Sequence, residues 1–351
     1  MIRWKMLAAA CTAAISAAPL AGTAQDDVVK VVANRQVTLT MPEGSGVVRY
    51  FGTGSLAGDR RAARALIVIH GVLRNADVYE HSGEEALSAA GGTDAAQTLV
   101  ITPQFLAVED VNAYALPPST IRWTAGGWSG GDPAVAPAPI SAFSVLDAIV
   151  ERLADKHRFP AMREIVVFGH SAGGQLVHRY AVVGPVPEAL APSPVHVHFI
   201  VANPSSYLYF DDKRPARSGA YAPPDAGACP DYNRWRYGFE RVPPYVNQSA
   251  AAYEQRFISR DVTYLLGEKD VDPNDHYLDK SCAGMAEGPY RHARGFAYVQ
   301  YLKARHPSGT AQTIAEVPGV GHDGEKMLGS RCGVAVLFDR PRSGCLTAER
   351  I

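Results

Sequence analysis

Short, almost continuously apolar runs recur along the chain and are its clearest pattern. Five of them are rich in valine and isoleucine, at residues 65–71, 98–103, 164–170, 195–204 and 262–268. Strands of a parallel sheet that is covered on both faces need this composition, because neither side of such a strand faces water. We therefore expect these five runs to be buried parallel strands.

Helical periodicity separates several of these runs. Residues 141–157 carry one apolar stripe, with Ser141 in the position of an N-cap, and the stripe consists of Val145, Leu146, Ile149, Val150 and Leu153. In residues 291–306 a similar spacing puts Ala293, Phe296, Ala297 and Tyr301 on one side. The alternation of strands and helices predicts an α/β protein with a doubly wound, mostly parallel sheet.

Two further strands are expected upstream, and one long stretch interrupts the rhythm downstream. Residues 28–42 and 46–52 resemble leading strands, the first with strict alternation at Val37, Leu39 and Met41. From about residue 203 to residue 260 the chain is rich in proline, tyrosine and arginine, and it is too long for an ordinary connection. We interpret this stretch as a cap inserted between strands of a single domain that spans residues 25–351.

The overall composition of the 351 residues is ordinary for a globular protein. The chain is 47% hydrophobic and 20% charged, with a formal net charge of −1 and with lysine and arginine scattered along it. This distribution argues against a nucleic-acid surface and against a strongly anionic partner. It leaves the oligomeric state open.

The first residues have the layout of a secretory signal peptide. Arg3 and Lys5 precede an alanine-rich apolar stretch, and small residues follow up to Ala24. The apolar stretch ends at Pro19, short of the ~20 residues that span a membrane. We expect cleavage after Ala24, no stable membrane anchor, and export to the periplasm or out of the cell.

Cleavage there would remove Cys11 and leave an even number of cysteines. The remaining four are Cys229, Cys282, Cys332 and Cys345. In an exported chain such a set indicates disulfides rather than a metal or redox centre. Four cysteines allow three pairings, and the sequence order favours Cys229–Cys282 and Cys332–Cys345. We expect no metal and no cofactor.

A serine lies where the run at 164–170 gives way to a helical pattern. The sequence Gly-His-Ser-Ala-Gly-Gly at residues 169–174 gives Ser171 the context of a nucleophile elbow, in which a tight turn exposes the serine hydroxyl above a sheet. The pattern Gly-x-Ser-x-Gly also occurs around Ser129, but no apolar strand precedes it and prolines follow where a helix is needed. We interpret Ser171 as the nucleophile and Ser129 as a loop residue.

Four motifs in this order resemble the α/β-hydrolase superfamily. They are VIHG at residues 68–71, GHSAGG at 169–174, LLGEKD at 265–270 and VPGVGHD at 317–323. The resemblance covers nearly everything after about residue 45. It implies the α/β-hydrolase fold and a serine, an acid and a histidine in that chain order.

The resemblance also implies roles for particular residues. His322 follows the last expected strand and is the candidate base for Ser171. The family pattern has the acid three residues after the strand-end glycine, which favours Asp270, with Asp272 and Asp275 as alternatives in the same turn. Backbone N–H groups of Val72 and Ala172 would form the oxyanion hole.

The favoured function is hydrolysis of a small-molecule carboxylic ester through an acyl-enzyme intermediate. The alternatives are a lipase or polyester depolymerase, a peptidase, and a non-catalytic binding protein on the same fold. A peptidase of this fold usually carries a large additional domain, for which the chain has no room. A binding protein usually lacks a triad member, whereas all three positions are filled here.

Aromatic residues are concentrated in the expected cap and in a glycine-rich loop at residues 117–139. We expect Tyr207 and Trp235 of the cap and Trp128 of the loop to contact the substrate, because ligands of this fold bind above the strand ends in mostly apolar pockets. The predicted substrate is a moderately apolar ester with a short to medium acyl chain or an aromatic group.

Overall fold

The apolar runs form the middle of one sheet. A computed structural model describes residues 27–186, 188–190, 195–216 and 218–351, so the predicted signal peptide lies outside the described residues. In spatial order the strands of the sheet are β1 (Arg35–Met41), β2 (Gly44–Gly52), β4 (Thr98–Gln104), β3 (Arg64–Ile69), β5 (Glu164–His170), β6 (His196–Ala202), β9 (Val262–Gly267), β10 (Thr313–Val317) and β11 (Ala348–Arg350). The strands from β4 to β10 pair in parallel, whereas β1, β2 and β11 pair antiparallel. The predicted mostly parallel sheet is confirmed.

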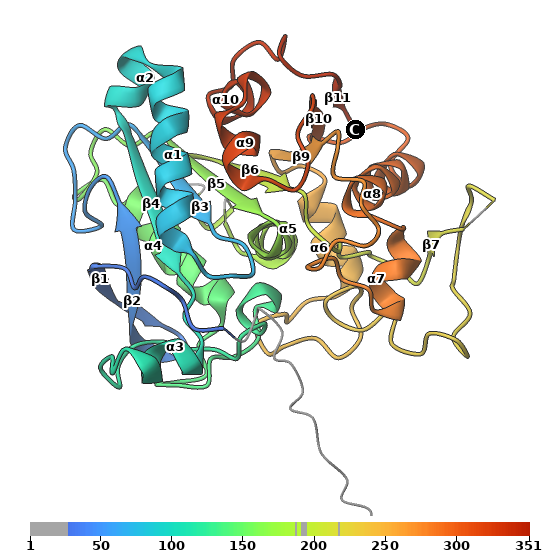
Figure 1. Cartoon of the computed structure of the whole chain (residues 1–351), viewed down its shortest axis with the longest axis horizontal. Helices are drawn as coiled ribbons and strands as arrows, with labels where there is room; N and C mark the ends of the chain where they lie inside the picture. Colours follow the sequence, from blue (N-terminus) through green and yellow to red (C-terminus); the bar gives the residue numbers. More distant parts are fainter. Residues whose placement is uncertain (1–26, 187, 191–194, 217) are drawn as a thin grey trace, which may run out of the picture.

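Helices cover both faces of this sheet, because successive strand side chains point to opposite sides. Leu66 and Val68 of β3 pack with α1 (Ala76–Ala90), α9 (Gly324–Gly329) and α10 (Arg331–Leu337). Ile67 and Ile69 of the same strand belong to a second core, which the sheet shares with α4 (Ala142–Ala154), α5 (Ala172–Val183), α6 (Ala250–Phe257) and α8 (Arg291–Arg305). Figure 1 shows α1, α9 and α10 together on one side of the strands. The shorter helices are α2 (Gly92–Ala96), α3 (Val108–Ala113) and α7 (Cys282–Glu287).

Two of these helices test the predicted stripes. In α4 the predicted stripe is fully buried, and the Ser141 hydroxyl caps the helix by accepting a hydrogen bond from the Phe143 N–H. In α8 the predicted stripe is only partly confirmed, because Tyr301 is buried whereas Ala293, Phe296 and Ala297 are only partly buried. The buried face of α8 instead contains Arg291, Arg294, Gly295, Tyr298, Val299, Tyr301 and Leu302. Because two of these buried residues are arginines, a search for hydrophobic periodicity does not identify this face.

The irregular stretch after β6 is shorter than predicted and does not form a separate layer. It contains one small hairpin, of β7 (Arg214–Pro215) and β8 (Tyr221–Ala222). It ends at Ser249, which caps α6, and α6 packs against α5 as an ordinary connecting helix. We call residues 203–249 the irregular segment.

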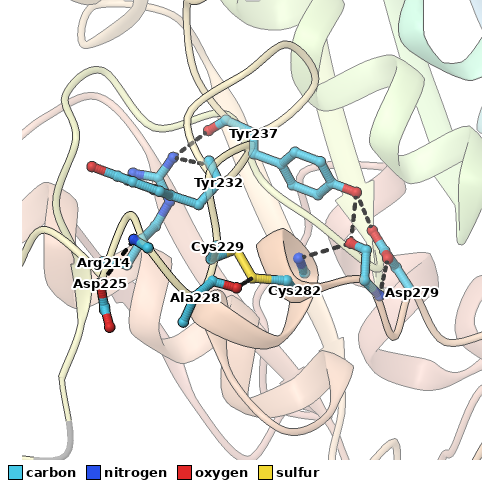
Figure 2. The surroundings of a disulfide bond; sticks show 11 residues. Arg214, Asp225, Ala228, Cys229, Tyr232, Tyr237, Asp279 and Cys282 are labelled. Atoms are coloured by element: carbon cyan, nitrogen blue, oxygen red, sulfur yellow. Dashed lines mark hydrogen bonds between the residues drawn. A yellow bond between two sulfur atoms is a disulfide. The ribbon is translucent and has the colours of Figure 1, made fainter.

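Two disulfides fasten irregular chain to the sheet domain. Cys229 of the irregular segment pairs with Cys282 at the start of α7 (Figure 2), and Cys332 of α10 pairs with Cys345. These are the two pairs that the sequence order favours. Among the described residues, no helix is both long and apolar enough to cross a membrane.

Candidate active site

The turn from β5 to α5 places Ser171 in a strained conformation at the edge of the sheet. Its φ of 60° and ψ of −121° are unusual for a residue with a side chain. The turn can be this tight because the two glycines that follow it, Gly173 and Gly174, lack side chains. A Cβ on Gly173 would overlap the carbonyl oxygen of Ile69, and one on Gly174 would lie 2.6 Å from the carbonyl oxygen of Ala202. This geometry is that of a nucleophile elbow.

Three loops at the same edge of the sheet bring a serine, a histidine and an aspartate together. Ser171 follows β5, Asp270 follows β9 and His322 follows β10. The Ser171 hydroxyl lies 2.9 Å from Nε2 of His322, and Nδ1 of His322 lies 2.7 Å from Oδ2 of Asp270. A serine, an imidazole and a carboxylate in this order can pass a proton from the hydroxyl to the ring while the carboxylate orients the ring.

Of the three aspartates in the acid turn, only Asp270 contacts the histidine. Asp270 is 3% exposed, whereas Asp272 is exposed and accepts a hydrogen bond from the Asn274 N–H. Asp275 pairs with Arg291 at 2.8 Å. The position three residues after Gly267 is therefore the one that reaches His322.

The second Gly-x-Ser-x-Gly sequence lies in a different setting. Ser129 belongs to a short 3₁₀ helix, Trp128–Gly130, and its hydroxyl donates a hydrogen bond to the Gly126 carbonyl oxygen. No imidazole is hydrogen-bonded to it among the described residues. Its contact is that of a loop residue.

Two other buried histidines surround the serine and hold the loops. Nε2 of His70 accepts a hydrogen bond from the Phe105 N–H, and Nδ1 donates to the Gly71 carbonyl oxygen. Burial lowers the pKa of His70 to about 4, so the ring is neutral. The His170 ring packs 4.6 Å from the His322 ring, and its Nδ1 bonds the Tyr79 hydroxyl at 2.9 Å.

The predicted oxyanion donors lie at the two sides of the elbow. Ala172 is the first residue of α5, where backbone N–H groups have no acceptor within the helix. Val72 lies inside a turn closed by the hydrogen bond from the Arg74 N–H to the Gly71 carbonyl oxygen. That carbonyl is also bound by His70, which fixes the orientation of the Gly71–Val72 peptide.

A cavity of about 280 Å³ opens beside Ser171 and His322. Three large apolar residues on its wall are unusually exposed, namely Leu73 (39%), Val78 (44%) and Tyr277 (40%). Its floor includes Tyr79, Ser82 and His170, and its charged wall residues are Asp323 and Glu325. No lysine or arginine of the described chain lines this cavity.

The three aromatic residues that we expected to contact substrate do not line this cavity. Trp128 is 0% exposed and stacks on Phe105, and Tyr207 is 0% exposed and stacks on Tyr298. Trp235 is partly buried and donates to the Gly130 carbonyl oxygen at 2.7 Å. The large rings are used for packing, and the irregular segment that carries two of them supplies no wall to the cavity.

The apolar residues that do form the cavity wall could not be picked out from the sequence. Leu73, Val78 and Tyr277 lie in short, mixed stretches of apolar and polar residues, without period or motif. Exposed apolar residues near the elbow are a weak signal that only the folded chain makes meaningful.

Solved structures resemble most of the chain, whereas no family model and no curated protein matches the sequence. The poly(aspartic acid) hydrolase-1 of Sphingomonas sp. KT-1 superposes with a TM-score of 0.56 and 22% identity, over 86% of this chain and 96% of that one. LpqC, the poly(3-hydroxybutyrate) depolymerase of Bordetella parapertussis, gives a TM-score of 0.58 and 20% identity, over 88% and 92%. At this identity the likeness concerns the fold, and this chain has the α/β-hydrolase fold.

Proposed function

We propose that this chain is a serine hydrolase that cleaves carboxylic esters through an acyl-enzyme intermediate. The observation that carries the proposal is the continuous set of hydrogen bonds from Ser171 through His322 to Asp270, at the strained turn after β5. A serine hydroxyl is a poor nucleophile at neutral pH and needs such a base. The fold is compatible with many reactions, so the reaction class rests on these three residues.

The chemistry follows from the order of the three groups. Ser171 Oγ attacks the ester carbonyl carbon while Nε2 of His322 takes the hydroxyl proton, and Asp270 stabilises the imidazolium that forms. The N–H groups of Val72 and Ala172 would bind the oxyanion. The tetrahedral intermediate then expels the alcohol, which leaves with the proton from His322. Water attacks the acyl-enzyme in the same way, and the acid is released with Ser171 restored.

The cavity beside Ser171 supports a small and moderately apolar substrate group. Its volume of about 280 Å³ is near the lower limit for small-molecule pockets. Leu73, Val78 and Tyr277 offer apolar surface to a short or medium acyl chain or to an aromatic ring. Asp323 and Glu325 would repel a carboxylate, which favours a neutral substrate over a polyanion such as poly(aspartic acid). The repeating unit of poly(3-hydroxybutyrate) is an uncharged ester, so oligomers of 3-hydroxybutyrate, which carry a single terminal carboxylate, are the second candidate.

The proposal is tested by active-site labelling and a substrate series. A fluorophosphonate probe should modify the protein once, and peptide mapping should find the probe on Ser171. Hydrolysis of p-nitrophenyl esters should peak at short to medium acyl length. Absence of labelling together with absence of esterase activity would refute the proposal. Highest activity on emulsified long-chain triglyceride would make the protein a lipase.

A matched pair of variants tests which aromatic residue meets the substrate. Tyr277→Ala should lower kcat/KM for a medium-chain ester about tenfold and leave acetate esters nearly unchanged, because the lost contact is to the far end of the acyl group. Trp235→Ala should lower stability and leave the chain-length profile unchanged, since Trp235 packs on Phe143 and bonds Gly130. If the chain-length profile changes in Trp235→Ala and not in Tyr277→Ala, the substrate binds at the irregular segment and not in the cavity.

We further propose that the protein works outside the reducing cytosol. Two disulfides in a chain of this kind are typical of exported proteins. The signal peptide predicted from residues 1–24 would deliver it there. The mass of the protein recovered from the producing cells should correspond to a chain that begins at Gln25.

A further inference from the structure

Arg291, the first residue of α8, contacts Asp270 on the side of the carboxylate that faces away from His322. Its side chain is completely buried, and Nε donates to the Ser205 hydroxyl at 3.0 Å. Nη2 donates to Oδ1 of Asp275 at 2.8 Å, and Nη1 lies 3.5 Å from Oδ1 of Asp270. Oδ2 of Asp270 bonds His322, so the guanidinium lies beside the carboxylate oxygen that the imidazole leaves free.

A buried carboxylate needs such a partner to stay ionised. Asp270 is 3% exposed, and an ion taken from water into the protein is strongly destabilised unless an opposite charge compensates it. In the side-chain hydrogen bonds of the described residues, Arg291 is the partner of Oδ1 of Asp270. A separation of 3.5 Å is long for a hydrogen bond, so the guanidinium acts here chiefly through its charge.

We propose that Arg291 is a positioning residue for the hydrolytic reaction, one that compensates the buried charge of Asp270 and keeps its carboxylate turned toward His322. Asp275 and Ser205 in turn hold the guanidinium in place. The inference rests on the proposed function, because it gives Arg291 a role only if Asp270 and His322 act on Ser171.

The charges around the pair fix the sign of the expected pH effect. The charged and titratable side chains packed about Asp270 and His322 are His170 at the end of β5, Tyr207, Asp275, Arg291, and Asp323, which pairs with Lys326. Burial raises the pKa of Tyr207 well above its ordinary value, so Tyr207 is uncharged. Burial holds the pKa of His170 well below its ordinary value, so His170 is neutral. Burial acts to raise the pKa of Asp275, but Arg291 and the charge of His322 outweigh it and lower that pKa. Arg291 and Asp275 therefore act on the imidazolium with opposite sign.

Activity should show both effects. Arg291→Met should reduce kcat about 100-fold through misplacement of the acid. It should also move the acidic limb of the kcat/KM profile about one unit toward higher pH, because protonated states of the Asp270–His322 pair become easier to form. Asp275→Asn should move the same limb toward lower pH. Arg291→Lys keeps the charge and should restore kcat to within about tenfold of the wild type.

Arg294 provides the matched control, because it is equally buried on the same face of α8 but bonds carbonyl oxygens of Gly288, Ser205 and Asp279. Arg294→Met should lower the unfolding temperature and leave the acidic limb in place. A wild-type protein that hydrolyses no ester would overturn the proposed function itself. An active wild type whose acidic limb does not move in Arg291→Met, or moves in the same direction in Asp275→Asn, would overturn only the role of Arg291. If Arg291→Met does not fold, the profiles of Arg291→Lys and Asp275→Asn decide.

Discussion

The turn from β5 to α5 and the irregular segment at residues 203–249 bury their backbone by different means. On the β5 side, each strand residue pairs with β3 and β6, and the helix that follows satisfies its own backbone groups. Most side chains of β5 are apolar and pack in the two cores, and its polar residues have partners, with Glu164 paired to Arg64 and His170 bonded to the Tyr79 hydroxyl. The Ser171 hydroxyl is therefore not needed to satisfy the backbone and is free for chemistry with His322.

The irregular segment has almost no strand or helix to satisfy its backbone, and buried arginines supply the missing donors. Arg214 is 1% exposed and donates to the carbonyl oxygens of Asp211, Lys213, Tyr232 and Tyr237, two of which Figure 2 shows. The Cys229–Cys282 bridge and the hydrogen bond from the Tyr237 hydroxyl to Asp279 complete the attachment (Figure 2). Polar side chains in the irregular segment therefore stabilise the fold by satisfying backbone groups. The Ser171 side chain has no such role, because strand and helix hydrogen bonds satisfy the backbone around it.

The largest effect that this comparison predicts is on activity in the regular region. Ser171→Ala should reduce kcat by roughly 10⁶, the scale for loss of a triad nucleophile, with little change in stability. Ser129→Ala should keep most of the activity and cost about 1 kcal/mol of stability, because its hydroxyl bonds Gly126. Kinetics and urea unfolding of both variants provide the test. Probe labelling that survives in Ser171→Ala and disappears in Ser129→Ala would reverse the assignment.

The next effect separates two aspartates of one turn. Asp270→Asn should lower kcat by about 10⁴, because the amide no longer fixes the histidine tautomer. Asp272→Asn should stay near the wild type, since Asp272 is exposed and bonds only the Asn274 N–H. Steady-state rates of the two purified variants decide, and equal losses would mean that His322 can recruit the second carboxylate.

A smaller effect, on stability alone, is expected from the irregular segment. Arg214→Met leaves several buried carbonyl groups without a donor and should cost about 3–5 kcal/mol in the free energy of unfolding. Arg234→Met, in the same segment, removes only a surface pair with Asp231 and should cost less than about 1 kcal/mol. Ile165→Val in β5 should cost about 1 kcal/mol. If Ile165→Val proves the most costly in urea titrations, buried arginines do not hold the segment.

The same contrast explains what could be predicted from the sequence. The run at 164–170 coincides with β5, and the other four apolar runs match β3, β4, β6 and β9 to within a few residues. A strand that is buried on both faces needs apolar residues at nearly every position, and this composition is visible in the sequence. Ser171, Asp270 and His322 each follow a parallel strand, and the ends of parallel strands meet at one edge of the sheet. The three residues could therefore be predicted as a group once the strands were recognised.

Where burial uses polar or small residues, the sequence pattern fails. Helix α1 buries the polar Ser82 and packs Gly83 against Val100 of β4, so its periodicity is faint. The buried face of α8 carries Arg291 and Arg294, which a hydrophobicity pattern assigns to solvent. The rings of Trp128 and Tyr207 were wrongly expected at the substrate because an aromatic residue in a loop gives no sign of which side it packs on.

The smallest predicted effect concerns a carboxyl group buried between the irregular segment and α8. Glu287 is 0% exposed, and one oxygen accepts a hydrogen bond from the Tyr207 N–H. Burial raises the pKa of Glu287 to about 8, although Arg214, Arg294 and the Tyr207 N–H act to lower it. The carboxyl group is therefore neutral at pH 7 in the folded protein and ionised in the unfolded chain.

The sign of the pH dependence follows from this difference. A carboxyl group whose pKa is raised on folding gives its full stabilisation below the unfolded pKa, near 4.5, and loses it as the pH rises through about 8. Between about pH 6.5 and pH 9 the wild type should lose about 2 kcal/mol of unfolding free energy relative to Glu287→Gln. Asp147, whose pKa burial raises to about 6, titrates mostly below this window. Glu287→Gln keeps the shape of the neutral acid and should not show this loss in urea titrations over the same range. Burial lowers the pKa values of His70, His170, His178 and His198, which adds the same rise in stability to both proteins, so the difference between the two profiles is the measure. A slope equal to that of the wild type would mean that Arg214 and Arg294 hold Glu287 ionised, and the segment would then be fastened by a buried ion pair instead of by a neutral carboxyl group.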